Sequence, residues 1–320
     1  MRVALIPTGM MELLGLERCL SRLFPEHVFE VVPRVPAAPG RAAEPFHQSF
    51  THRQQAASPD DETPKNLTKL VQELAGQVYP RRRDAADLAV VLDDLELFNV
   101  DQPEVVVAAV RDAVRRHVAR EPRPDERREL GRCLREHASL HLAVPMTESW
   151  FFGDLRSMAD NGVPPDRAPR LPLAMDPEAF AADDPEFSAD DGSGCAQMLD
   201  RNRRRPHEQR RAPWLIGPQL GLPWFSRERH PKAYLEWLCR DPKDNKCTTW
   251  RESGAGKDAL QKLDWAAVLA EPTYCTYARA LLDDIAEALG EPWPFPEGGS
   301  LAEATRRKRS DPSAVLRNIA

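Results

Sequence analysis

Short apolar runs in the first 150 residues constrain the fold of this chain more than any other feature of its sequence. The run from Asp87 to Leu92 is nearly continuous instead of alternating with polar residues, which indicates a central strand buried on both faces. Arg2 to Ile6, His27 to Val35 and Ser139 to Val144 predict three more strands. Helical spacing separates these runs, over Met10 to Phe24, Leu67 to Val78, Pro103 to Val118 and Asp125 to Glu136. Strands that alternate with helices predict an α/β fold with a parallel sheet flanked by helices.

The sequence changes character after Trp150, where proline, aspartate and arginine dominate before helical patterns return. We predict an α/β core over residues 1–150 and a proline-rich and arginine-rich connecting segment over 151–212. A mainly helical, loop-rich part over 213–300 and a basic tail over 301–320 follow, and we expect the tail to be weakly ordered.

Composition excludes several classes of protein. With 42% hydrophobic residues and a net charge of −6 over 320 residues, the chain is expected to fold around a core. No segment reaches the roughly 20 apolar residues of a membrane-spanning helix, and the amino terminus does not read as a signal peptide. We therefore expect a cytoplasmic protein with no membrane contact. The six cysteines are scattered, which favours reduced core thiols over disulfides or a zinc ribbon.

Acidic residues follow three of the predicted strands. In a parallel sheet these positions meet at the carboxyl edge, where ligands of such folds bind. Several carboxylates at one edge require a compensating cation, and oxygen ligands favour Mg²⁺ or Mn²⁺. The alternative is that these residues only cap helices and turns. The candidates are Glu12, Asp93, Asp94, Glu96 and Glu148.

The motifs around these acids resemble the toprim fold. They are Gly9-Met10-Met11-Glu12, the segment VVLDDLE at 90–96, and Glu148-Ser149-Trp150. More narrowly, the chain is similar to a bacterial toprim-like family of unknown function, related to the overcoming-lysogenisation-defect nucleases and often found near ATPases in defence loci. The segments 230–238, 250–252, 260–269 and 277–289 also resemble the carboxyl half of that family.

The resemblance implies a Mg²⁺- or Mn²⁺-dependent nuclease or phosphoryl-transfer subunit of a bacterial antiviral defence system, with an ATPase partner. It assigns metal binding to Asp93, Asp94, Glu96 and Glu148, and the orientation or deprotonation of water to Glu12. One position departs from the pattern, because Thr8 stands where toprim proteins usually carry glutamate. The alternative is therefore a catalytically silent scaffold or sensor that binds a partner protein or nucleic acid.

Two basic segments are candidate contacts for DNA or RNA. Guanidinium groups bind phosphate in bidentate fashion, although a solvated face or a contact to an acidic partner is an equal alternative. His47, His52 and Arg53 lie in a proline-rich excursion that either leans over the sheet edge toward phosphate or is simply solvated. The arginine-rich segment contains Arg201, Arg203, Arg204, Arg205, Arg210 and Arg211.

Overall fold

The computed structural model describes most of the first 190 residues and most of the carboxyl-terminal hundred. The described residues are 1–32, 50, 52–55, 62–79, 85–190, 221–222, 224–240, 248–295, 299–308 and 311–320.

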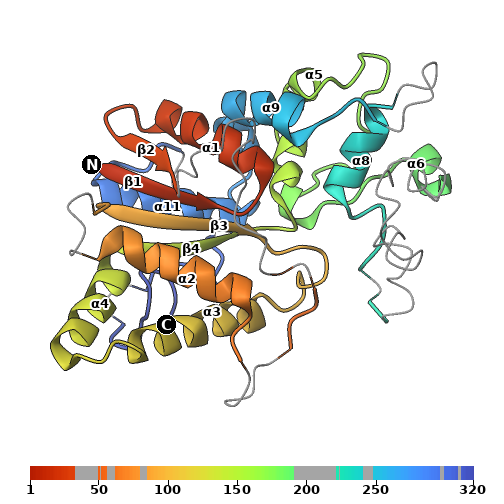
Figure 1. Cartoon of the computed structure of the whole chain (residues 1–320). Coiled ribbons are helices and arrows are strands. Elements are labelled where there is room, and N and C mark those ends of the chain that lie inside the picture. The colour runs from red at the N-terminus through yellow and green to blue at the C-terminus, as the bar shows by residue number, and fades with distance from the viewer. Residues whose placement is uncertain are drawn as a thin grey trace, which may run out of the picture.

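A four-stranded parallel sheet forms the centre of the molecule (Figure 1). Its strands are β1 (Arg2–Pro7), β2 (Val28–Val31), β3 (Leu88–Asp94) and β4 (Ala138–Ala143), in the order β2-β1-β3-β4. All seven residues of β3 and all six of β4 are buried, as the continuous apolar run of β3 predicts. The α/β class with a parallel sheet flanked by helices is confirmed, and it is consistent with a toprim-like fold.

Helices connect successive strands and cover both faces of the sheet. They are α1 (Met10–Leu23), α2 (Lys65–Val78), α3 (Pro103–Ala119) and α4 (Pro124–His137). Side chains of a strand alternate between faces, so Val90 packs in the cluster with α1 while Val91 packs in the cluster with α2, α3 and α4. In Figure 1, α1 lies on one side of the sheet and α2, α3 and α4 on the other.

The carboxyl half covers the α1 face of the sheet. Its side chains share one hydrophobic cluster with β1, β3 and α1, including Trp150, Tyr234 and Leu281. Helix α9 packs on α1, and α11 packs on β4. The elements are η1 (Thr147–Phe152), α5 (Ser157–Asp160), η2 (Pro177–Ala179), α6 (Pro185–Ala189), α8 (Pro231–Leu238), η6 (Glu252–Gly256), α9 (Lys257–Lys262), α10 (Trp265–Val268) and α11 (Thr276–Leu289).

The last ten residues pack against the outer edge of β4. Leu316, Asn318 and Ile319 are fully buried. The Asn318 side chain bonds both backbone groups of Leu140, accepting from its N–H at 3.2 Å and donating to its carbonyl at 2.6 Å. The expectation of a weakly ordered tail is therefore wrong for residues 311–320, because apolar burial and strand-like hydrogen bonds hold them in place.

The predicted core thiols are found where the structure describes them. Cys19, Cys133, Cys239 and Cys275 are buried and free. Across the described ranges, no helix is long and apolar enough to cross a membrane.

Candidate functional site

The predicted acids come together at the carboxyl edge of the sheet. Glu12 lies in the first turn of α1, directly after β1, while Asp93 and Asp94 end β3. Glu148 is the second residue of the short helix η1 that follows β4. Glu12, Asp93, Asp94 and Glu148 are buried, and Glu96 is half-buried. The parallel sheet therefore converts distant sequence positions into one buried acidic cluster.

Thr147 joins two of these carboxyl groups. Its hydroxyl lies within hydrogen-bond distance of Glu12 Oε1 and 3.0 Å from Asp94 Oδ1, and its backbone N–H donates to the same Asp94 oxygen at 3.1 Å. A hydroxyl carries a single proton, so it donates to one of the two carboxyl groups at a time. The pair therefore favours either a shared proton or a nearby cation.

Gly9 makes room for the Glu12 side chain. A Cβ atom at position 9 would lie 1.9 Å from Glu12 Oε2, closer than any side chain tolerates. Any residue with a Cβ at position 9 would therefore force the carboxyl end of the Glu12 side chain to shift.

Thr8 connects β1 to the acids of β3. Its backbone N–H donates to the Leu92 carbonyl at 3.2 Å, and its hydroxyl donates to Asp93 Oδ1 at 2.5 Å. Where a glutamate would add a further negative charge, threonine supplies a hydrogen-bond donor. Thr8 therefore holds the Asp93 carboxyl group in place and supplies no general base.

The turn after β3 places Glu96 beside the other acids. Its N–H donates to the Pro145 carbonyl at 2.8 Å, and the preceding Leu95 N–H donates to the Ala143 carbonyl at 2.9 Å. Glu96 has a φ of 59°, in the left-handed region that non-glycine residues rarely occupy. The two hydrogen bonds, one to the last residue of β4 and one to Pro145, hold this conformation.

Lys232 and Glu252, which the sequence analysis did not single out, complete the cluster. Lys232 Nζ lies 3.6 Å from Glu148 Oε1 and forms an ion pair with Glu252 Oε1. Lys232 lies in α8 and Glu252 in η6, so neither follows a strand. Their only signal was that both fall in the segments 230–238 and 250–252, which resemble the toprim-like family.

Burial and mutual repulsion favour protonation of the acids. Burial, followed by the charge of Glu148, raises the pKa of Glu12 from 4.5 to about 7. Burial also raises the pKa of Glu96 to about 7, although Lys232 opposes this shift, and it raises the pKa of Asp94 well above its usual range. Although burial opposes it, Glu148 and Glu252 raise the pKa of Lys232, which keeps its charge.

The candidate metal ligands have the chemistry that a hard divalent cation requires. Every candidate ligand is a carboxylate oxygen, as Mg²⁺ and Mn²⁺ prefer. Among the residues that the structure describes, however, no three or more His, Cys, Asp and Glu side chains form a ready-made metal site. Binding an ion would therefore require the Glu12 and Asp94 carboxylates to move from their bonds with Thr147.

The basic candidates are not part of the described site. Arg53 is held by the turn after β3, since it donates to Asp101 Oδ1 at 2.7 Å and to the Phe98 carbonyl at 2.9 Å. His52 lies beside Phe98, with ring centroids 6.5 Å apart. His47 and the six arginines Arg201, Arg203, Arg204, Arg205, Arg210 and Arg211 lie outside the described residues.

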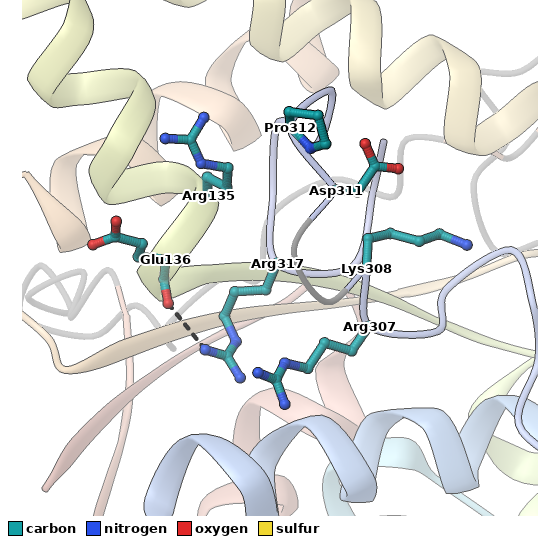
Figure 2. A pocket seen from close by; sticks show the side chains of 7 residues that line it. All are labelled: Arg135, Glu136, Arg307, Lys308, Asp311, Pro312 and Arg317. Atoms are coloured by element: carbon teal, nitrogen blue, oxygen red, sulfur yellow. Dashed lines mark hydrogen bonds between the residues drawn. The ribbon is translucent and has the colours of Figure 1, made fainter.

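A basic cavity of about 360 Å³ lies away from the acidic cluster, near the amino end of β4 (Figure 2). Arg307 and Arg317 both pair with Glu287 on α11, and Lys308 pairs with Glu303 at 2.8 Å. These ion pairs offset the positive charge of the residues that line the cavity. We therefore interpret the cavity as part of the attachment of the tail. Its lining residues are Arg135, Glu136, Arg307, Lys308, Asp311, Pro312 and Arg317.

Comparison of the chain with protein-family models, with curated proteins and with solved structures found no match. The acidic cluster therefore has to be interpreted from its own chemistry.

Proposed function

We propose that this chain is a Mg²⁺- or Mn²⁺-dependent phosphoryl-transfer enzyme, most specifically a nuclease. The observation that carries the proposal is the convergence of acids from three strand ends at one buried edge of the sheet. Such a cluster is unfavourable in the protein alone, because burial penalises each negative charge. A divalent ion would offset this cost and would supply Lewis-acid activation of a phosphodiester and of water.

The chain's own residues have separate roles in this proposal. Asp93, Asp94 and Glu148 would hold the ion, and Glu96 extends this acidic set. Glu12 would orient or deprotonate the attacking water, a role suited to its pKa of about 7. Lys232 supplies a fixed positive charge at the same edge, which favours the approach of an anionic phosphodiester.

The biological setting is proposed from the resemblance to the toprim-like family. A subunit of a bacterial antiviral defence system that works with an ATPase and acts on DNA or RNA agrees with that resemblance. The arginine-rich segment would then contact the nucleic acid.

A cleavage assay tests the activity directly. DNA and RNA are incubated with the full chain and Mn²⁺ or Mg²⁺, alone and together with the products of neighbouring genes. We expect metal-dependent cleavage that Asp94→Asn and Glu12→Gln abolish and that the matched change Glu17→Gln, on the exposed side of α1, leaves intact. Absence of cleavage in every combination would remove the proposal.

The second candidate function is a catalytically silent scaffold or sensor, and Thr8 favours it. Thr8 donates a hydrogen bond to Asp93 where toprim proteins usually present a glutamate. The two functions differ in their response to Asp94→Asn. A scaffold keeps partner binding and protection against phage after this change, whereas a nuclease loses protection.

A further inference from the structure

We infer that the outer edge of β4 is an interaction surface for an extended segment, and that residues 311–320 of a second copy of this chain can occupy it in place of the chain's own. The inference is independent of the proposed function, because it concerns the edge of the sheet and not the acidic cluster. It rests on the way in which residues 311–320 are bound in the structure.

Strand β4 lies at the end of the strand order β2-β1-β3-β4, so within the described sheet one of its edges has no neighbouring strand. An edge of this kind presents backbone N–H and carbonyl groups that pair readily with another extended segment. All six residues of β4 are buried, so a segment of protein must pair with these groups in place of water.

Residues 311–320 cover this edge with bonds of the kind that an added strand makes. The Arg317 N–H donates to the Ala138 carbonyl at 2.9 Å. The Asn318 side chain accepts from the Leu140 N–H at 3.2 Å and donates to the Leu140 carbonyl at 2.6 Å. The two bonded residues of β4 are two positions apart, as the alternation of a strand requires. Recognition of extended peptides at sheet edges uses backbone bonds of this kind.

The side chains of the same segment match the surface beside β4. Leu316 and Ile319 are fully buried and belong to the hydrophobic cluster that contains β4. The Arg317 guanidinium pairs with the Asp284 and Glu287 carboxylates of α11, at 3.0 and 2.6 Å. Two apolar anchors on either side of an arginine and an asparagine therefore define the sequence that this edge binds.

A second copy of this chain carries that sequence, so its residues 311–320 match the β4 edge as closely as the chain's own do. Exchange of identical segments between two copies conserves every contact and needs no new surface. Within one chain the segment is tethered beside its site, which favours the closed monomer. We therefore expect a dimer by exchange when the contact within each chain is weakened and the contact between chains is not.

A pair of charge-reversed variants of the full chain tests the inference. Arg317→Glu brings a carboxylate against Asp284 and Glu287 of its own chain. Glu287→Arg brings a further guanidinium against Arg307 and Arg317 of its own chain. In an equal mixture, each variant offers the charge that the other needs. By sedimentation velocity we expect the mass of a monomer for the wild type and for each variant alone, and twice that mass for the mixture.

The matched control mixes Arg317→Glu with Glu17→Arg, a charge reversal on the exposed side of α1, and this mixture should stay monomeric. A monomeric mixture of the two test variants would overturn the inference. Dimers that also form in the control mixture would overturn it as well, because the contact would then not depend on the exchanged charges.

A peptide replaces the mixture if circular dichroism shows that either test variant does not fold. A labelled peptide of residues 311–320 is titrated into the full chain that carries Asn318→Ala, whose own segment is bound less tightly. We expect the peptide to bind, and the same peptide with Asn318→Ala to bind at least about tenfold more weakly, because two backbone groups of Leu140 then lose their partner. Equal binding of the two peptides, or no binding of either, would overturn the inference.

Discussion

Glu12 shows how the fold changes the chemistry of a single residue. On an exposed helix a glutamate is ionised at neutral pH, but here burial and the neighbouring Glu148 bring its pKa to about 7. The sequence placed Glu12 after a strand, and this position alone predicted that it would face other acids. It did not predict Thr147 as the bonding partner, because the turn after β4 determines which side chain meets Glu12.

The pKa shifts predict that the metal-free protein loses stability as pH rises. A carboxyl group whose pKa is higher in the folded than in the unfolded chain contributes stability below its unfolded pKa, and this contribution is lost as pH rises through the folded pKa. For Glu12 and Glu96 the window runs from 4.5 to about 7. Each shift corresponds to roughly 3 kcal/mol. Urea unfolding with chelator at pH 5, 6, 7 and 8 measures this loss.

Glu12→Gln isolates one of the two groups. It should reduce the fall in unfolding free energy between pH 5 and pH 8, because glutamine stays neutral while keeping an oxygen that accepts from Thr147. Glu17→Gln, on the same helix but exposed, should retain the full slope. A wild-type stability that is level across this range would show that folding does not raise the pKa values of these acids.

At the scale of the elements, the strands and most helices could be predicted from periodicity. The contacts that the carboxyl half makes with the sheet could not. The run at 87–92 predicted β3 because burial on both faces leaves no room for polar alternation. Lys232 and Glu252 escaped prediction because α8 and η6 reach the sheet edge through tertiary packing, which leaves no local pattern. The attachment of the tail was not predicted for the same reason. Its basic composition gave no indication that Leu316 and Ile319 are buried.

Asn318 is expected to be the main polar anchor of the tail on β4. Its side-chain amide bonds the N–H and the carbonyl of Leu140 as a neighbouring strand would. Asn318→Ala leaves both buried backbone groups unpaired, which should cost about 2–4 kcal/mol of unfolding free energy. Urea unfolding measures this cost, and Ser313→Ala, an exposed change in the same tail, is the control. A loss below roughly 1 kcal/mol would mean that water replaces the lost bonds and that the tail is not anchored there.

At the scale of the whole molecule, the carboxyl half completes the site instead of forming a separate unit. Its side chains share one hydrophobic cluster with β1, β3 and α1, and it delivers Lys232 and Glu252 to the carboxyl edge of the sheet. The change in composition after Trp150 marks where the alternation of strands and helices ends. Composition shows which residues each half of the chain contains. Whether the two halves share a core depends on which apolar faces pack together in the folded chain.

A divalent ion should therefore stabilise the whole chain. An ion that binds only the folded state adds about 2.7 kcal/mol at 100 times its dissociation constant. For a chain of 320 residues this corresponds to a rise of about 4 °C in the melting temperature. Differential scanning calorimetry at pH 8, with Mg²⁺ or Mn²⁺ against chelator, measures the rise.

The double change Asp93→Asn with Asp94→Asn should act in the opposite way. Each asparagine keeps an oxygen that can accept the bonds from Thr8 and Thr147, while the repulsion among the acids is reduced. The metal-free variant should therefore melt above the metal-free wild type, and added metal should no longer raise its melting temperature. Asp87→Asn, at the exposed amino end of β3, should respond to metal as the wild type does. If the wild type and the double variant melt alike with and without metal, these carboxylates only close turns and cap helices, and the metal-dependent function fails although the fold stands.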